Sequence, residues 1–224
     1  MCTVTYIPTI SGCIITSNRD EKISREKAIP PSEYLIGEKK IIFPKDPKAG
    51  GTWIAHSETK IVVLLNGAKE KHIPKTIYKK SRGLVVLELI SAQNSLSYWN
   101  SIHLNNIEPF TIIIFENNCL FQLEWDEIKK RSEKLDETQF YIWSSSTLYN
   151  QEIKKIRKTW FMDFMRKNNN PCKEKILSFH QFTKKENKKY GLQINHSNLL
   201  KTVSISQCEI KNNRIEMYYL DLID

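Results

Sequence analysis

Short β-rich runs joined by tight turns are the feature that most limits how this chain can fold. Val and Ile recur in these runs, and Gly, Pro, Asn and Ser stand between them, as expected for strands and hairpin turns. Three pairs of runs are predicted hairpins: 4–7 with 13–17, 52–56 with 60–66, and 111–115 with 119–123. Because connections this short can join only antiparallel strands, we expect antiparallel sheets.

In the middle of the chain, apolar residues recur at the spacing of a helix. Three segments have this spacing, at 83–100, 150–167 and 174–182. The stripe in 150–167 is interpreted as core packing and consists of Ile153, Ile156, Trp160, Phe161, Phe164 and Met165. Further short strands are predicted at 40–43, 140–144, 202–210 and 215–222, and the rest of 28–50, which is polar and rich in Pro, should have little regular structure. The pattern predicts an α+β fold with antiparallel sheets covered by helices.

The size and charge of the chain are those of an ordinary globular protein. Its 224 residues with 40% apolar content suffice for one core, so we expect a single domain over 1–224. The net charge of +9 could indicate a nucleic acid or an anionic membrane. The lysines are spread along the chain, however, often as pairs such as Lys39 with Lys40 and Lys129 with Lys130. No nucleic-acid-binding motif accompanies them, so no nucleic-acid partner is predicted.

The spacing of the cysteines and the character of the N-terminal residues predict that the protein is kept in a reducing environment. The five cysteines are irregularly spaced, without a CxxC motif or a paired histidine cluster, which argues against a disulfide framework and a metal site. The N-terminus lacks a signal-like apolar stretch, and no apolar run approaches the length of roughly 20 residues that a membrane span needs. We therefore expect a cytoplasmic protein. Without a P-loop or GxGxxG motif, no nucleotide cofactor is expected either.

Cys2 could carry a specific chemistry. Removal of Met1 would place a thiol and a free α-amine on one residue. Such an amine has a pKa of about 7.7 to 8.0, so it can accept the thiol proton without a histidine partner. A cysteine near a terminus is by itself weak support, because termini tolerate most residues.

The first hairpin predicts the neighbours of Cys2. If its turn centres on Ile10 and Ser11, the numbers of paired residues sum to about 21, and Cys2 lies opposite Arg19. The segment 18–21 would then surround the N-terminus. A carboxylate there can hold the α-ammonium, and Arg19 can lower the thiol pKa or bind an anionic group. The alternative is a polar strand end rich in turn-forming residues.

Several motifs together resemble one known family. They are Met1-Cys2, Asn18-Arg19-Asp20-Glu21, Gly50-Gly51-Thr52-Trp53, Asn66 at a strand end, and Ser81-Arg82-Gly83. The combination resembles the NRDE family, also called the transport and Golgi organisation protein 2 family. The likeness is dense over the first half of the chain, and 141–148 and 201–204 look like later motifs. It implies the N-terminal-nucleophile (Ntn) hydrolase fold, a four-layer αββα sandwich of two antiparallel sheets.

The resemblance also implies kinship with choloylglycine hydrolases and penicillin V acylases, which use an N-terminal cysteine on linear or cyclic amides without a cofactor. By position, Cys2 would be nucleophile and base, with Arg19 and Asp20 beside it. Asn66 would donate to the oxyanion, unless it only forms a turn with Gly67. Substrate contacts would come from Asn18, Trp53 and Ser145, although the pattern favours a core residue over a substrate contact for Trp53, whose place in the GGTW motif keeps it near the proposed site.

Two departures from the family pattern leave the function open. Ser145 stands where the family tends to have Asn, and Leu220 lies in a segment where the acylase relatives carry Arg. One interpretation is an N-terminal-cysteine amidohydrolase that cleaves a non-peptide C–N bond in an N-acyl amide. The other is a non-catalytic module that binds or traffics a hydrophobic, lipid-like small molecule. The sequence predicts no particular substrate or oligomeric state.

Overall fold

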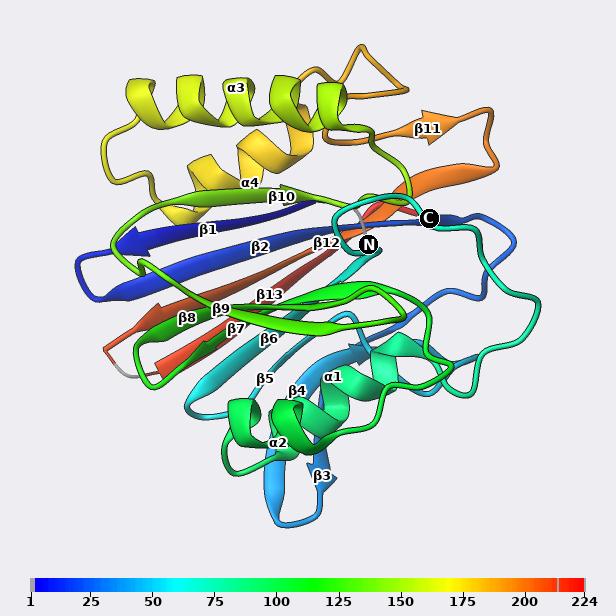
Figure 1. Ribbon diagram of the computed structural model, residues 1–224. Coiled ribbons are helices and arrows are strands. Elements are labelled where there is room, and N and C mark those ends of the chain that lie inside the picture. The colour runs from blue at the N-terminus through cyan, green and yellow to red at the C-terminus, as the bar shows by residue number, and fades with distance from the viewer. Residues whose placement is uncertain (1–2, 213, 224) are drawn as a thin grey trace. The chain divides into compact units, whose positions relative to one another are not determined.

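The computed structural model describes residues 3–212 and 214–223, which form two compact units. One unit combines the segment before Glu26 with the segment after Glu137, and the other is Glu26–Glu137. Within each unit, the described residues form an antiparallel sheet with two helices packed on it (Figure 1). The predicted α+β class with two antiparallel sheets is therefore confirmed.

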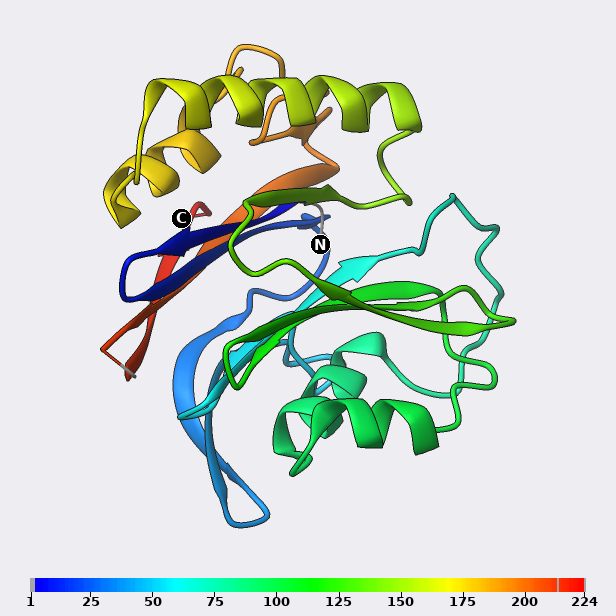
Figure 2. The same cartoon turned by 60° about the vertical axis from the view of Figure 1, so that its left-hand side comes forward.

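The sheet of the first unit is built around the opening hairpin. In spatial order its strands are β10 (Tyr141–Ser144), β1 (Thr3–Thr9), β2 (Gly12–Lys22), β12 (Leu200–Lys211) and β11 (Asn195–His196), and β13 (Arg214–Asp221) also pairs with β12. Helices α3 (Gln151–Lys167) and α4 (Lys173–Phe182) cover one face of this sheet (Figure 2). Their apolar side chains, among them Phe161 and Phe179, pack on Ile7 and Ile14 of the hairpin.

The register of the opening hairpin agrees with the prediction. The paired residue numbers sum to 21 along the ladder, from Thr9 opposite Gly12 to Thr3 opposite Asn18. The strands extend beyond the predicted runs at both ends, because β2 continues through the polar residues up to Lys22. The predicted pairing of Cys2 with Arg19 lies outside the described residues.

Helix α3 forms where periodicity predicted it, but its buried face differs from the prediction. Asn150 caps the helix, since its Oδ1 accepts a hydrogen bond from the Ile153 backbone nitrogen at 3.0 Å. The buried residues of the helix are Ile153, Arg157 and Phe161, whereas Ile156 is 38% exposed. The predicted stripe is therefore confirmed at Ile153 and Phe161 and wrong at Ile156, because the hydrogen-bonded guanidinium of Arg157 takes the core position one turn after Ile153.

The second unit is a meander in which every strand pairs with the next. Its seven strands are β3 (Ile29–Ile36), β4 (Lys39–Lys45), β5 (Ile54–His56), β6 (Lys60–Asn66), β7 (Phe110–Glu116), β8 (Cys119–Trp125) and β9 (Lys130–Leu135). Helices α1 (Arg82–Ser91) and α2 (Ser95–Ser101) lie along one face (Figure 2). Val85 and Leu89 of α1 and Trp99 of α2 pack there on Ile112 and Ile114.

The two outer strands of this sheet were not predicted. The stretch 28–50 was expected to be irregular apart from 40–43, but it contains the β3–β4 hairpin, and β9 had no predicted counterpart. Both β3 and β9 are edge strands with mostly exposed or half-buried residues, so neither shows a clear apolar alternation. Pro30 and Pro31 fit in β3 because they lie where its pairing with β4 shifts register, between Ile29 and Ser32, on an edge strand.

The predicted helix over 83–100 is interrupted between Ser91 and Ser95. A buried ion pair lies at the break, where the Lys60 Nζ is 2.9 Å from the Glu116 Oε1. Lys60 also donates to the Ala92 carbonyl oxygen at 2.5 Å, and the Ser95 backbone nitrogen donates to the Glu116 Oε2 at 3.2 Å. The sheet thus supplies partners for the end of α1 and the start of α2, which helical periodicity could not reveal.

Candidate functional site

Asp20 is a buried candidate side chain whose two carboxylate oxygens are both hydrogen-bonded. It lies on β2 with 4% of its surface exposed. Its Oδ1 accepts a hydrogen bond from the Thr202 hydroxyl at 2.5 Å, and its Oδ2 accepts one from the Tyr149 hydroxyl at 3.1 Å. The carboxylate is therefore buried among hydroxyl groups of β12 and of the segment before α3, and both of its oxygens are oriented.

A buried arginine supports the Tyr149 ring. The Arg157 guanidinium carbon lies 3.7 Å from the centre of that ring. Arg157 donates to the Thr3 Oγ1 at 2.7 Å and to the carbonyl oxygens of Gly191 and Tyr190 at 2.6 and 3.1 Å. It is completely buried and forms no ion pair with a carboxylate of the described residues. Its charge is therefore compensated by the dipoles of the two carbonyl groups and the Thr3 hydroxyl, and by the ring of Tyr149.

His180 forms a second buried contact between α4 and the hairpin. Its Nε2 lies 2.8 Å from the Thr5 Oγ1, and its Nδ1 lies 2.7 Å from the Asn18 Oδ1. Burial, reinforced by the charge of Arg157, lowers the pKa of His180 to about 3, so the ring is neutral at physiological pH. Because the amide oxygen can only accept, Nδ1 donates to Asn18 and Nε2 accepts from Thr5.

Asn18, predicted to contact substrate, has its polar atoms engaged in this contact. Its Nδ2 donates to the carbonyl oxygens of Leu192 at 2.7 Å and His180 at 3.3 Å. Thr3, Thr5, Asn18 and Asp20 all lie on the face of the sheet that carries α3 and α4. That face therefore carries a network of buried polar groups at the Thr3 end of the hairpin.

Arg19 points away from this network, since successive side chains of a strand lie on opposite faces. It is 5% exposed, and its Nη2 lies 3.9 Å from the Glu21 Oε2. The Glu21 Oε2 is in turn 3.7 Å from the Arg25 Nε.

The pairing of β2 with β12 shifts register between Thr202 and Ser204, next to Asp20 and Arg19. Such irregularities are frequent beside functional sites.

Ser145 belongs to the turn that positions Tyr149. It is 1% exposed, its hydroxyl shares a hydrogen bond with the Thr147 hydroxyl at 2.7 Å, and its carbonyl accepts from the Tyr149 backbone nitrogen at 3.1 Å. Ser145 is thus connected to Asp20 through the backbone and side chain of Tyr149.

The remaining candidates lie in the second unit. Asn66 is the half-buried last residue of β6 and pairs with Phe110. Trp53 is 3% exposed, and its carbonyl oxygen accepts from the Leu64 backbone nitrogen at 2.9 Å. Asn66 follows two residues after Leu64, so one stretch of β6 carries both the Trp53 contact and Asn66.

The glycine motifs of this unit contact each other. The Thr52 backbone nitrogen donates to the Gly83 carbonyl oxygen at 3.2 Å. A Cβ on Gly51 would overlap the Gly83 carbonyl carbon and lie 2.7 Å from the Leu84 nitrogen. The segments 50–53 and 81–83 therefore need glycine where their backbones touch, and this contact fixes the start of α1 beside β5.

Sequence reasoning missed the side chains that hold Asp20 and Asn18, namely Thr202, Tyr149 and His180, and it missed Arg157, which supports the Tyr149 ring. Arg157 left one usable signal, a charged residue within the predicted apolar stripe. Among residues 3–212 and 214–223 there is no group of three or more potential metal ligands. In the same described part of the chain, no helix combines the length and the apolar character needed to cross a bilayer.

The protein has an Ntn-hydrolase-like fold. A variant of conjugated bile acid hydrolase from Clostridium perfringens aligns with a TM-score of 0.57, covering 99% of this chain and 92% of that chain, at 9% sequence identity. At this identity the likeness concerns the fold alone.

The family follows from the sequence. The model for the family described as Transport and Golgi organisation 2 matches residues 1–218, so the chain belongs to this family. The suspected family is therefore confirmed. No curated protein matches the sequence.

Proposed function

We propose that the chain is an N-terminal-cysteine amidohydrolase that cleaves a non-peptide C–N bond of the N-acyl amide type. The observation that carries the proposal is the carboxylate of Asp20, buried on β2 with both oxygens oriented by Thr202 and Tyr149. A carboxylate held in this way can orient an ammonium or amine group close to it. The Ntn-hydrolase-like fold supports the same chemistry.

The proposed mechanism begins at Cys2 after removal of Met1. The α-amine takes the thiol proton, the thiolate attacks the amide carbonyl, and the C–N bond breaks as the leaving amine receives that proton. Water then hydrolyses the thioester and restores the thiol. Cys2 is taken to pair with Arg19, the next step in the register that is observed for Thr3 and Asn18. Arg19 would favour the thiolate, Asp20 would orient the amine, and Asn66 would donate to the oxyanion.

Reactivity of the thiols tests this proposal without knowledge of the substrate. Protein from cells is first analysed by intact mass, which should show a chain that begins at Cys2. A chloroacetamide probe is then applied over a pH series, and the modified sites are mapped. We expect Cys2 to react well below the ordinary thiol pKa of about 8.5, and faster than the exposed Cys172. A retained Met1, or a Cys2 that reacts no faster than Cys172, would contradict the N-terminal-base mechanism.

A non-catalytic module for a lipid-like small molecule is the second candidate. The observation that favours it is Ser145, whose buried hydroxyl is engaged with Thr147, at a position where the family tends to have an amide side chain. Leu220, in the segment where acylase relatives carry Arg, pairs with Ile205. For this candidate, a panel of acyl amides should bind without turnover, and Cys2→Ala should leave their dissociation constants unchanged. Cytoplasmic localisation stays a prediction.

A further inference from the structure

The loop that joins β6 to α1 is long, and contacts along its length attach it to the rest of the unit. Residues 67–81 contain no helix or strand. The His72 Nε2 lies 3.1 Å from the Glu108 Oε1, the Lys75 Nζ lies 3.0 Å from the Glu127 Oε1, and the Lys79 backbone nitrogen donates to the Asn106 carbonyl at 2.8 Å. Long loops without secondary structure are uncommon in compact domains and often functional. These contacts hold the loop against the β8–β9 turn and the segment before β7.

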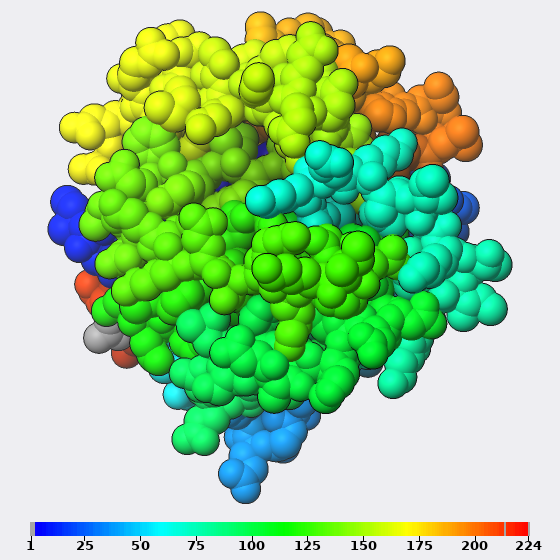
Figure 3. Space-filling model, viewed as in Figure 1, coloured from blue at the N-terminus to red at the C-terminus, as the bar shows by residue number. Residues whose placement is uncertain are grey.

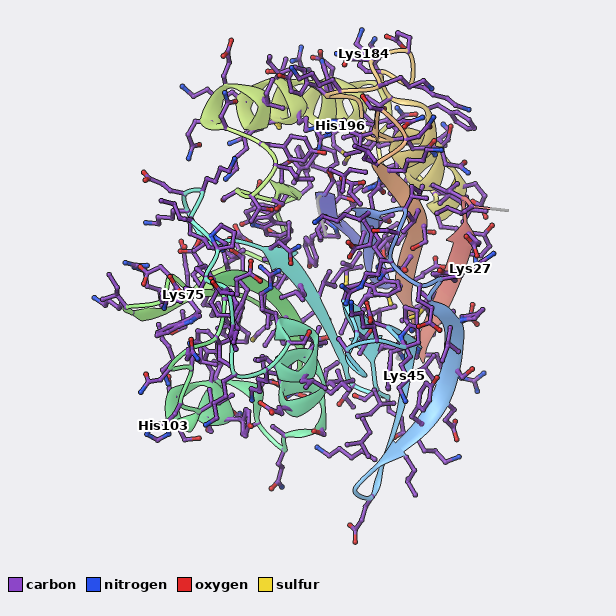
Figure 4. All side chains as sticks on the ribbon, turned by 90° about the vertical axis from the view of Figure 1, so that its right-hand side faces the viewer. Lys27, Lys45, Lys75, His103, Lys184 and His196 are labelled. Carbon is purple, nitrogen blue, oxygen red and sulfur yellow. The ribbon has the colours of Figure 1, made fainter. Side chains whose placement is uncertain are left out.

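The residues between the attachment points expose apolar side chains. Ile73 is 91% exposed and Ile77 is 76% exposed, one on each side of Lys75 in the sequence. Ile128, next to Glu127 in the β8–β9 turn, is 90% exposed. The contact of Lys75 with Glu127 therefore brings together two loops that each expose isoleucine. The loop lies at the surface (cyan to teal in Figure 3), with Lys75 at its outer side (Figure 4).

Lysines surround these isoleucines. Segments 67–81 and 126–129 contain six lysines against three acidic residues, which leaves a net charge of +3. Lys71, Lys79 and Lys129 are exposed. A single exposed apolar side chain is ordinary on a protein surface, but isoleucines on adjoining loops with lysines between them match the chemistry of a membrane interface. Apolar side chains enter the headgroup region there, and ammonium groups bind anionic lipids.

We propose that these two loops dock the protein on the surface of an anionic lipid bilayer. Ile73, Ile77 and Ile128 enter the interface, while Lys71, Lys79 and Lys129 contact the headgroups. A nucleic acid would use the lysines but gain little from exposed isoleucines, so the lipid surface accounts for both features. This inference is independent of the proposed amide hydrolysis.

Vesicle flotation with the full chain tests the proposal. Vesicles of phosphatidylcholine with phosphatidylserine should bind the protein, and vesicles of phosphatidylcholine alone should not. Each of Ile73→Ser, Ile77→Ser and Ile128→Ser should lower the partition coefficient about tenfold. Each of Lys71→Gln, Lys79→Gln and Lys129→Gln should lower it about fivefold, and added salt should weaken binding.

The matched control is Ile10→Ser, since Ile10 is 97% exposed in the β1–β2 turn and has no charged residue directly beside it in the sequence. It should bind vesicles like the wild type. Thermal unfolding of every variant shows whether the fold is retained, as expected for exposed positions. The proposal is overturned if no vesicle binds, if Ile10→Ser weakens binding as much as Ile73→Ser, or if only the lysine variants have an effect. That last result would indicate that charge alone attaches the protein to the vesicles, without entry of the isoleucines into the interface.

Discussion

At the scale of single residues, the first unit depends on charges and polar groups that are buried without an opposite charge beside them. Arg157 is the clearest example, because its three hydrogen bonds end on the Thr3 hydroxyl and on two backbone carbonyls. Removing the guanidinium would leave these buried acceptors without a donor, and an unsatisfied buried group costs more than the net value of its hydrogen bond.

We therefore expect Arg157→Met to lower the free energy of unfolding by about 3 kcal/mol. Urea denaturation followed by tryptophan fluorescence measures this change. Lys158→Met is the matched control, since Lys158 is the neighbouring exposed residue of α3 and should change stability by less than about 0.5 kcal/mol. Similar losses in both variants would mean that the Arg157 hydrogen bonds contribute little.

His180 should make stability depend on pH. The unfolded chain has a histidine pKa of about 6.5, whereas burial holds the pKa of His180 at about 3 in the folded state. Between these values the unfolded state binds more protons, so the stabilisation is complete above pH 6.5 and is lost as the pH falls. From pH 7 to pH 5, the wild type should lose about 2 kcal/mol more unfolding free energy than His180→Gln.

The control for this experiment is His103→Gln, because His103 is exposed (Figure 4). Its pH dependence should equal that of the wild type. If His180→Gln also loses stability like the wild type between pH 7 and pH 5, protonation of His180 is not what destabilises the fold in acid.

At the scale of elements, the sequence predicted those features that depend on residues close together in the chain, such as turns and hairpin register. The hairpin register followed from a turn at Ile10 and Ser11, and the β7–β8 turn at Asn117 and Asn118 has the positive φ values that Asn tolerates. The edge strand β3 was missed because its residues are exposed or half-buried, so its sequence shows no clear alternation of apolar and polar residues. The break between α1 and α2 was missed because Lys60 and Glu116 come from strands far away in the sequence.

The contact between 50–53 and 81–83 predicts unequal costs for two neighbouring glycines. Gly51→Ala should lower the free energy of unfolding by about 3 kcal/mol, because the new methyl group would overlap the backbone of α1 at Gly83. Gly50→Ala should cost only about 1 kcal/mol, since Gly50 has a φ of 71° but open space around it. Chemical denaturation of both variants measures the difference, and equal costs would contradict a tight contact.

At the scale of the whole molecule, the candidate site shows where sequence reasoning stops. Asn18, Arg19 and Asp20 were found because they are adjacent in a recognisable motif. Their partners were not found, because Tyr149 lies 129 residues and Thr202 lies 182 residues from Asp20. No spacing rule connects such positions, and only the paths of β10 and β12 beside the hairpin bring them together. The fold class needed no such contacts, because strand and helix periodicities are local.

Cysteine accessibility gives a test of the global fold. Cys13 on β2 and Cys208 on β12 are fully buried, whereas Cys119 is half-buried and Cys172 is exposed. Burial raises the pKa of both buried thiols, and in Cys208 the neighbouring Cys13 adds to the effect. Both thiols should therefore react only when the sheet of the first unit opens.

In the native protein at neutral pH, a thiol reagent should modify Cys172 first and Cys13 and Cys208 at least about 10³-fold more slowly, as expected when reaction needs global unfolding. Peptide mapping after timed quenching distinguishes the sites, and Cys172→Ser should remove the fast signal without changing the slow ones. In urea at the unfolding midpoint, Cys13 and Cys208 should become reactive together, because they lie on adjacent strands of one sheet. Rapid modification of Cys13 alone in native buffer would show that the β1–β2 hairpin separates from β12 before the rest of the molecule unfolds.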